Sequence, residues 1–195
     1  MALILLASAG MDAQDDFYAQ VRFGMMTHTA LNLPKEVRSA FISESQQYEV
    51  FFGKKLFINE KYKLSGSVGF AQFQFSDSRQ FRDGETRRSR YFAVAYGLAR
   101  KLPAEKLSVS LGVSHYVLAH RDKQDFDQRR VFSNLELGFG YLIKKDLEVS
   151  VSSPWTIYPM FLKRVSVRSE DGTQSTRYNG VSRNLGASLG LKYNF

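Results

Sequence analysis

The chain ends on an alternating stretch that decides its fold, Asn184-Leu185-Gly186-Ala187-Ser188-Leu189-Gly190-Leu191-Lys192-Tyr193-Asn194-Phe195. Apolar residues occupy every second position, and small or polar residues lie between them. Because successive side chains of a β-strand point to opposite faces, the stretch predicts a strand with one apolar and one polar face. The pattern recurs in about eight segments, with Gly, Ser and Asn frequent on the polar faces. Such strands are typical of a lipid-facing barrel, so we predict an all-β, eight-stranded antiparallel up-and-down transmembrane β-barrel.

The connections between these segments alternate between long and short. The expected strands cover residues 17–27, 47–57, 62–75, 90–100, 107–119, 130–143, a segment from 147 onward, and 184–195. Residues 54–55 break the alternation of the second strand, and Pro154, which cannot donate to a ladder, is expected to interrupt the seventh. The apolar phase slips to Phe73 and Phe75, which predicts a bulge near residues 71–72. Long loops at one end and short turns at the other place both termini at the turn end.

Composition agrees with strands rather than helices as the membrane-crossing elements. Aromatic residues make up 14% of the 195 residues, yet the mean hydropathy is only −0.29. No stretch approaches the roughly 20 continuous apolar residues that a spanning helix needs. The chain has no cysteine, which excludes disulfides, thiolate catalysis and cysteine-based zinc sites.

The first residues are apolar and small and run from Met1 to Gln14, before the acidic pair Asp15-Asp16. This composition is that of the end of a secretory signal peptide, with cleavage near Ala13. We therefore expect residues 1–14 to be a signal-peptide remnant and residues 15–195 to form the barrel.

The eight alternating segments, the unequal loops and the closing aromatic strand resemble the small bacterial outer-membrane β-barrel superfamily of OmpA and OmpX type. The resemblance covers roughly residues 15–195. It implies a monomer in the outer membrane of a Gram-negative cell, with both termini in the periplasm. It also implies that the outer-membrane assembly machinery reads the terminal strand, through Leu191, Tyr193 and Phe195.

Alternation also directs several charged side chains into the lumen: Arg22, Lys63, Glu136, Glu148 and Lys192. The interior of an eight-stranded barrel is only just wide enough for side chains to fill. Charges buried there must pair, because desolvation otherwise costs several kcal/mol each. Arg22 and Glu136 are expected near mid-depth, and Glu148 and Lys192 near the turn end. The pattern favours a salt-bridged plug, and a narrow or gated ion path is the alternative.

The long loops carry most of the excess positive charge, and the whole chain has a net charge of +8. Guanidinium groups suit phosphate geometry, so loops at an outer surface are expected to meet lipopolysaccharide phosphates; solvated loops without a ligand are the alternative. The candidate contacts are Arg79, Arg82, Arg87, Arg88, Lys163 and Arg164. We expect no nucleic-acid partner, because the cations do not form a continuous face on regular elements.

A structural or surface-interaction role in the cell envelope, such as adhesion or ligand binding by the loops, is therefore the expected function. The alternatives are a small porin-like channel, a lipid A acyl hydrolase or transferase, and a soluble lipocalin-like binder with its apolar faces inside. His115 is expected to point toward lipid, but Ser114-His115-Tyr116-Val117 lacks the His-x-Ser spacing of the deacylase family. We predict no catalytic residue, no cofactor and no metal site.

Overall fold

The computed structural model describes residues 17–30, 42–57, 61–76, 86–103, 106–121, 130–159, 162–168 and 175–195. Its strands are β1 (Phe17–Ala30), β2 (Ile42–Phe57), β3 (Tyr62–Ser76), β4 (Thr86–Lys101), β5 (Leu107–Arg121), β6 (Val131–Lys144), β7 (Leu147–Tyr158), β8 (Leu162–Arg168) and β9 (Ser175–Asn194). Among the described residues, no helix is both long and apolar enough to cross a membrane. The predicted signal remnant at residues 1–14 lies outside the described residues.

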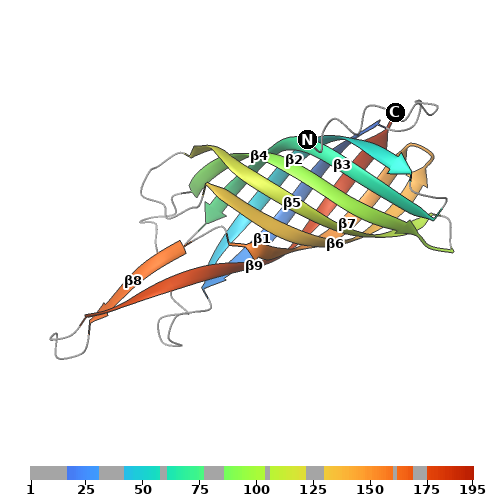
Figure 1. Ribbon diagram of the computed structural model, residues 1–195. Helices are drawn as coiled ribbons and strands as arrows, with labels where there is room; N and C mark the ends of the chain where they lie inside the picture. The colour runs from blue at the N-terminus through green and yellow to red at the C-terminus, as the bar shows by residue number, and fades with distance from the viewer. Residues whose placement is uncertain are drawn as a thin grey trace, which may run out of the picture.

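Eight of these strands close into a barrel (Figure 1). Each strand from β1 to β6 pairs antiparallel with the next, β7 pairs with β9, and β9 pairs back with β1. At the seam, the Phe195 amide donates to the Phe17 carbonyl at 3.1 Å. Closure satisfies the backbone of every barrel strand within the wall, which is the condition for crossing lipid with strands. The prediction of an eight-stranded up-and-down barrel is confirmed.

The last strand, β9, is longer than the alternating stretch alone indicates. β9 has 20 residues and starts at Ser175, nine residues before the expected start at 184. Its first part pairs with β8, from Leu162 opposite Val181 to Arg168 opposite Ser175. Figure 1 shows this two-stranded hairpin running out beyond the loop end of the barrel.

The bulge expected near residues 71–72 is absent, because the registers of β3 with β2 and with β4 run without a shift. Phe73 and Phe75 instead continue the lumen-facing phase and are fully buried. The register shift in this part of the wall lies between β4 and β5, where Arg90 opposes His120 and the next residue, Tyr91, opposes Leu118. One extra residue of β5 is accommodated there.

Pro154 does not end β7, which continues to Tyr158. The proline opposes Glu136 of β6, and the ladder with β9 resumes one residue later at Trp155. The Ser153 hydroxyl replaces the backbone N–H that Pro154 lacks, because it donates a hydrogen bond to the Gly186 carbonyl at 2.9 Å. The Trp155 indole then donates to the same hydroxyl at 2.9 Å. Pro154 therefore interrupts the pairing of β7 with β9 at residues 153–154, as expected, but it does not end the strand.

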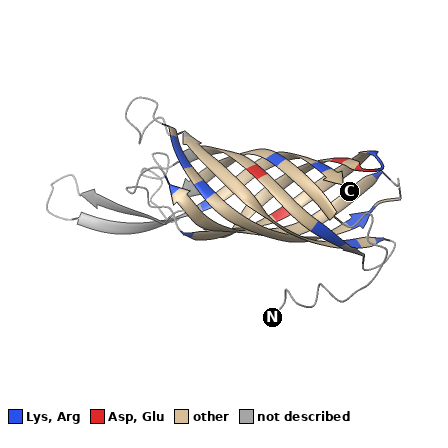
Figure 2. Cartoon of the chain, turned by 90° about the horizontal axis from the view of Figure 1, so that it is seen from above, with Lys and Arg blue, Asp and Glu red and all other residues tan. Residues whose placement is uncertain are grey.

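The outer wall is apolar and the lumen is polar at its middle and turn end. Val68, Phe70 and Leu185 are each at least 60% exposed on the outside. Most Lys and Arg residues lie toward the two ends of the barrel (Figure 2), and few charged residues lie at its middle, where the exposed outer side chains are apolar. This is the reverse of the soluble lipocalin-like arrangement and matches a wall that faces lipid.

Candidate functional site

The lumen is crossed at mid-depth by a cluster of charged and hydroxyl side chains. Arg22 of β1 holds two carboxylates: its Nε lies 2.7 Å from Glu49 Oε2, and its Nη1 donates to Glu136 Oε2. The Tyr116 hydroxyl donates to Glu49 at 2.6 Å, and the Ser114 hydroxyl donates to Glu136 at 2.5 Å. We call these five residues the ionic layer. Four strands supply them, so the layer ties opposite parts of the wall together.

Large aromatic side chains fill the loop-side half of the lumen. This aromatic layer consists of Phe73, Phe75, Tyr91 and Phe132, each fully buried. The Phe73 ring meets those of Tyr91 and Phe132 edge to face, at 5.5 and 5.4 Å between centroids. The Phe132 ring stacks on Tyr116 of the ionic layer at 4.4 Å. The two layers are therefore continuous. On the turn side of the ionic layer, the Phe51 ring lies 4.5 Å from the Arg22 guanidinium and lines the other half of the lumen.

A buried histidine lies beyond the aromatic layer toward the loops. His28 Nδ1 is 2.7 Å from Asn184 Oδ1, and its Nε2 is 2.7 Å from the Ser45 hydroxyl. Because an amide oxygen can only accept, Nδ1 carries the proton in this contact. The sequence placed His28 in a loop, whereas β1 continues to Ala30 and turns this ring into the lumen. The loop-side half is thus closed by rings and by polar groups bonded to one another.

Small residues line the turn-side half of the lumen. A cavity of about 120 Å³ lies there, and its wall includes Ser65, Ser67, Ser108, Ser110, Gly112, Gly138, Gly140, Ser150 and Ser152. We call it the serine chamber. The Ser152 and Ser188 hydroxyls are 2.6 Å apart across the β7–β9 pair. Side chains of this size leave the centre of the barrel unfilled, and Arg22 and Glu136 form its closed end.

Lysines surround the turn-side opening, where a second cavity has a volume of about 340 Å³. Its charged lining residues are Lys55, Lys63, Lys101, Lys106, Lys145, Lys192, Asp146 and Glu148. We call this the lysine mouth. Lys192 pairs with Glu148 at 3.0 Å, and the buried Lys55 ammonium donates to Asn194 Oδ1.

Comparisons with known proteins bear on the fold of this layered barrel. No family model and no curated protein matches the chain. Among solved structures, Neisserial surface protein A aligns with a TM-score of 0.50 at 9% identity, over 92% of this chain and 97% of the other. The fold is that of a small outer-membrane β-barrel.

Two further solved structures are similar over nearly their whole length. Ail of Yersinia pestis aligns with a TM-score of 0.48 at 13% identity, over 93% of this chain and 99% of the other. Outer membrane protein AlkL aligns with a TM-score of 0.48 at 14% identity, over 97% of this chain and 94% of the other.

Within this outer-membrane barrel fold, the structure brings together two pairs of the predicted lumen residues. Arg22 contacts Glu136 at mid-depth, and Lys192 contacts Glu148 near the turn end. Lys63 lies in the wall of the lysine mouth.

Sequence reasoning missed Glu49, although its side chain points into the lumen while those of its neighbours Tyr48 and Val50 point outward. The apparent break in alternation at residues 54–55 obscured which residues of β2 face the lumen. Lys54 in fact lies with its ammonium 5.4 Å from the centroid of the Phe17 ring, and Lys55 continues the phase into the lumen.

The predicted phosphate contacts divide into three groups. Arg79 and Arg82 lie outside the described residues, and Lys163 and Arg164 lie in β8, whose side chains are not described. Arg87 and Arg88 are not in a loop, because β4 already begins at Thr86. Arg88 is exposed, whereas Arg87 is partly buried and follows the phase of the lumen-facing residues of β4. The expectation that Arg87 lies in an outer loop is therefore wrong.

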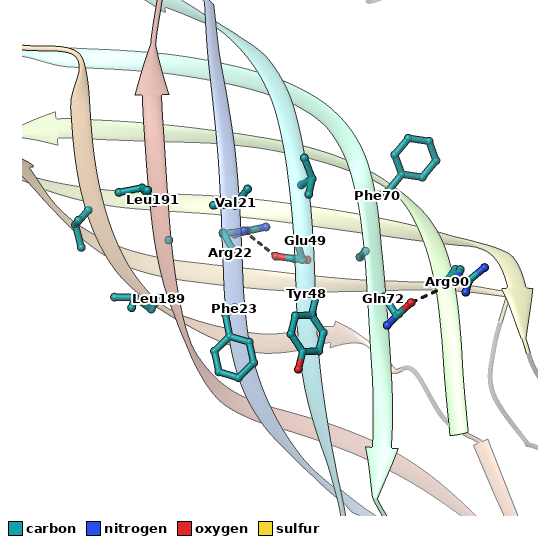
Figure 3. A pocket seen from close by; sticks show the side chains of 14 residues that line it. Val21, Arg22, Phe23, Tyr48, Glu49, Phe70, Gln72, Arg90, Leu189 and Leu191 are labelled. Atoms are coloured by element: carbon teal, nitrogen blue, oxygen red, sulfur yellow. Dashed lines mark hydrogen bonds and ion pairs between the residues drawn. The ribbon is translucent and has the colours of Figure 1, made fainter. Parts of the chain in front are cut away.

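The outer wall carries a shallow hollow of about 800 Å³ across β7, β9, β1, β2 and β3 and the edge of β4. Its apolar lining consists of Val21, Phe23, Tyr48, Val50, Phe70, Ala71, Val149, Leu189 and Leu191. Figure 3 shows Gln72 and Arg90 at one edge, where Arg90 Nε donates to Gln72 Oε1 at 3.4 Å. We call this surface the outer hollow. Arg90 places a cation where the apolar wall ends on the loop side.

The remaining predicted positions lie on the outer wall. Leu191, Tyr193 and Phe195 are about half exposed at the turn end of β9, with the last two rings stacked at 6.3 Å. His115 also faces outward, with Nε2 3.0 Å from the Tyr96 hydroxyl and Nδ1 2.7 Å from the Ser133 hydroxyl.

Proposed function

We propose that this protein is an integral barrel of the bacterial outer membrane with a closed lumen, both termini in the periplasm, and a structural or surface-interaction role rather than a catalytic one. The observation that carries the proposal is the stacking of the ionic layer on the aromatic layer. Side chains of Arg22, Glu49 and Glu136 are at most 12% exposed, and the rings beyond them are fully buried. A conducting path needs continuous water, which these two layers displace.

The apolar outer wall supports the membrane part of the proposal. Folding into detergent should give a compact form that migrates faster on a gel before boiling than after it. A protein that stays soluble and monomeric without detergent, with no shift on boiling, would overturn the membrane placement.

Conductance tests the closed lumen. Wild-type protein reconstituted in a planar bilayer should give no steady ion current, because no water column crosses the two layers. A stable, ohmic current from folded wild type would instead establish the small channel as the function.

Lipopolysaccharide is the partner that the outer hollow favours in this setting. Acyl chains fit its apolar floor, and Arg90 lies at the loop-side edge where a phosphate of the outer leaflet would be placed. Arg88 is exposed two residues earlier on the same strand. Guanidinium groups bind phosphate through charge-assisted hydrogen bonds.

A matched pair of variants tests this contact. Arg90→Gln should reduce the lipopolysaccharide retained after purification, measured by native mass spectrometry. Arg100→Gln is the control, because Arg100 is exposed at the turn end of the same strand, with its guanidinium 5.6 Å from the Tyr62 ring centroid. Equal retention by both variants would remove Arg90 from the contact.

The exposed terminal aromatic residues favour recognition by the assembly machinery during insertion. Phe195→Ala should lower the amount of folded barrel in membranes of an expressing cell while leaving refolding of purified protein unchanged. An equal loss in both assays would mean that Phe195 acts through stability alone.

A further inference from the structure

The serine chamber has two chemically different sides, one aromatic and one lined by hydroxyl groups. Tyr18 of β1 and Phe51 of β2 line the first side. Serines of β5 and β7 line the second side, with glycines of β6 between them. Three strands separate β1 from β5, and β2 from β6, in either direction around the closed wall. The rings and the hydroxyls therefore lie on opposite parts of the wall.

The Ser108 and Ser110 hydroxyls of β5 lie against the neighbouring strand and keep their hydrogen-bonding capacity. A Cβ on Gly140 would lie 2.6 Å from Ser108 Oγ, and a Cβ on Gly138 would lie 2.5 Å from Ser110 Oγ. Glycine at these opposing positions therefore leaves each hydroxyl its place. No hydrogen bond joins either hydroxyl to another described residue. Because a hydroxyl both donates and accepts, the two groups offer both functions to a ligand.

The closed end of the chamber favours a neutral ligand over an ion. The Arg22 side chain is 8% exposed there, and its Nη2 has no hydrogen-bond partner among the described residues. This unused donor suits an oxygen atom that carries no charge. Glu136 lines the same end and repels an anion, whereas Arg22 repels a cation. Nearer the turn end, the charged lining residues Glu148 and Lys192 pair with each other at 3.0 Å.

The position and size of the chamber limit what can enter it. Ser65, Ala99 and Ser108 line both the chamber and the cavity of the lysine mouth, so a molecule enters from the turn side. The chamber volume of about 120 Å³ lies below the roughly 300 Å³ at which sites for drug-sized ligands begin. The space therefore suits a molecule no larger than a single sugar ring.

We propose that the serine chamber binds a small neutral polyol in ring form, a single sugar unit, that enters from the turn side of the membrane. A face of a sugar ring consists of C–H groups that pack on an aromatic ring, and its edge carries hydroxyls that pair with other hydroxyls. The aromatic side and the hydroxyl side of the chamber match these two surfaces. This site goes beyond the surface role proposed above and needs only the folded barrel, whichever way the barrel is oriented.

Saturation-transfer NMR with methyl glucoside as the probe tests the site, in a zwitterionic detergent without sugar headgroups. Folded wild type should transfer saturation to the probe, with the same Kd at low and high salt because the probe carries no charge. Ser108→Ala/Ser110→Ala removes two hydroxyls and keeps the space open, so its Kd should rise about fivefold or more. The control Thr27→Ala/Thr86→Ala removes two exposed hydroxyls of the outer wall, and its Kd should change less than about twofold. A heat-modifiable band verifies that each variant is folded.

The open-chain polyol mannitol tests the aromatic side of the chamber. Mannitol carries hydroxyls but no ring face, so its Kd should be about fivefold or more above that of methyl glucoside. Equal affinity of wild type for the two probes would overturn the assignment of a ring-shaped ligand.

Two further results would overturn the proposal. No saturation transfer from folded wild type to methyl glucoside would mean that the chamber holds solvent only. Equal Kd values for the two double variants would mean that the probe binds outside the chamber. Reduced lipopolysaccharide retention by Arg90→Gln would leave this titration unchanged, and a failed titration would leave that retention unchanged, so the two proposals fail separately.

Discussion

The two halves of the lumen have the same wall but different contents. In the loop-side half, Phe73 and Tyr91 are fully buried against other rings. In the turn-side half, Ser67 and Gly97 of the same two strands, β3 and β4, line an open chamber. Since strand number and alternation are identical, the difference comes from the size of the residues at lumen-facing positions. Alternation determines that a barrel forms, and residue size determines where it is filled.

The ionic layer marks the border between the halves. Its carboxylates accept hydrogen bonds from Arg22, from Ser114 on the chamber side and from Tyr116 on the aromatic side. Substitutions in the two halves should therefore lower the free energy of unfolding by very different amounts.

The largest effect is expected from Arg22→Met, which leaves Glu49 and Glu136 buried without their cation. Removing one partner of a buried ion pair typically costs about 3–5 kcal/mol, and two carboxylates share this one. Urea unfolding in lipid vesicles measures the loss. The triple variant Arg22→Met/Glu49→Gln/Glu136→Gln should recover much of it, and no recovery would contradict the account of the border.

Phe73→Ala removes the ring at the centre of the aromatic layer. A buried Phe→Ala change costs about 3–5 kcal/mol, because the neighbouring rings cannot collapse into the space. Phe70→Ala is the control on the same strand, since Phe70 is 62% exposed on the outer wall and lipid can fill the gap. Equal destabilisation of the two variants in the same urea assay would mean that the loop-side half is not tightly packed.

Ser67→Ala should have the smallest effect. The Ser67 hydroxyl donates to the Ala95 carbonyl at a long 3.4 Å, and it borders a cavity rather than a packed core. We expect a loss of about 1 kcal/mol or less by urea unfolding. A loss as large as that of Phe73→Ala would show that the serine chamber is as tightly packed as the aromatic layer.

The alternation of the sequence was sufficient to predict the barrel and to place Arg22, Glu136, Glu148 and Lys192 in the lumen. It underestimated the strands at the loop end, because the outer wall there is polar and the alternation of hydrophobicity disappears while the ladder continues. β8 and the start of β9, which pair with each other beyond the barrel, were also missed.

Aromatic residues produced a different error. Phe73 and Phe75 look like lipid-facing residues when the outside is assumed to be the only apolar environment. A packed aromatic layer inside the lumen is a second such environment, and the sequence of one strand cannot distinguish them. The contact between Glu49 and Arg22 depends on the register of β1 with β2, in which the two residues are directly opposite.

Thiol accessibility tests the closed loop-side half most directly, because the chain has no native cysteine. Ser110→Cys places a thiol in the serine chamber, and Ser45→Cys places one beyond the aromatic layer, where Ser45 is 2% exposed. A small charged methanethiosulfonate added to the folded protein should modify the cysteine at 110 quickly and the cysteine at 45 only after unfolding. Modification of both at similar rates would contradict the account and show that water enters the loop-side half of the lumen.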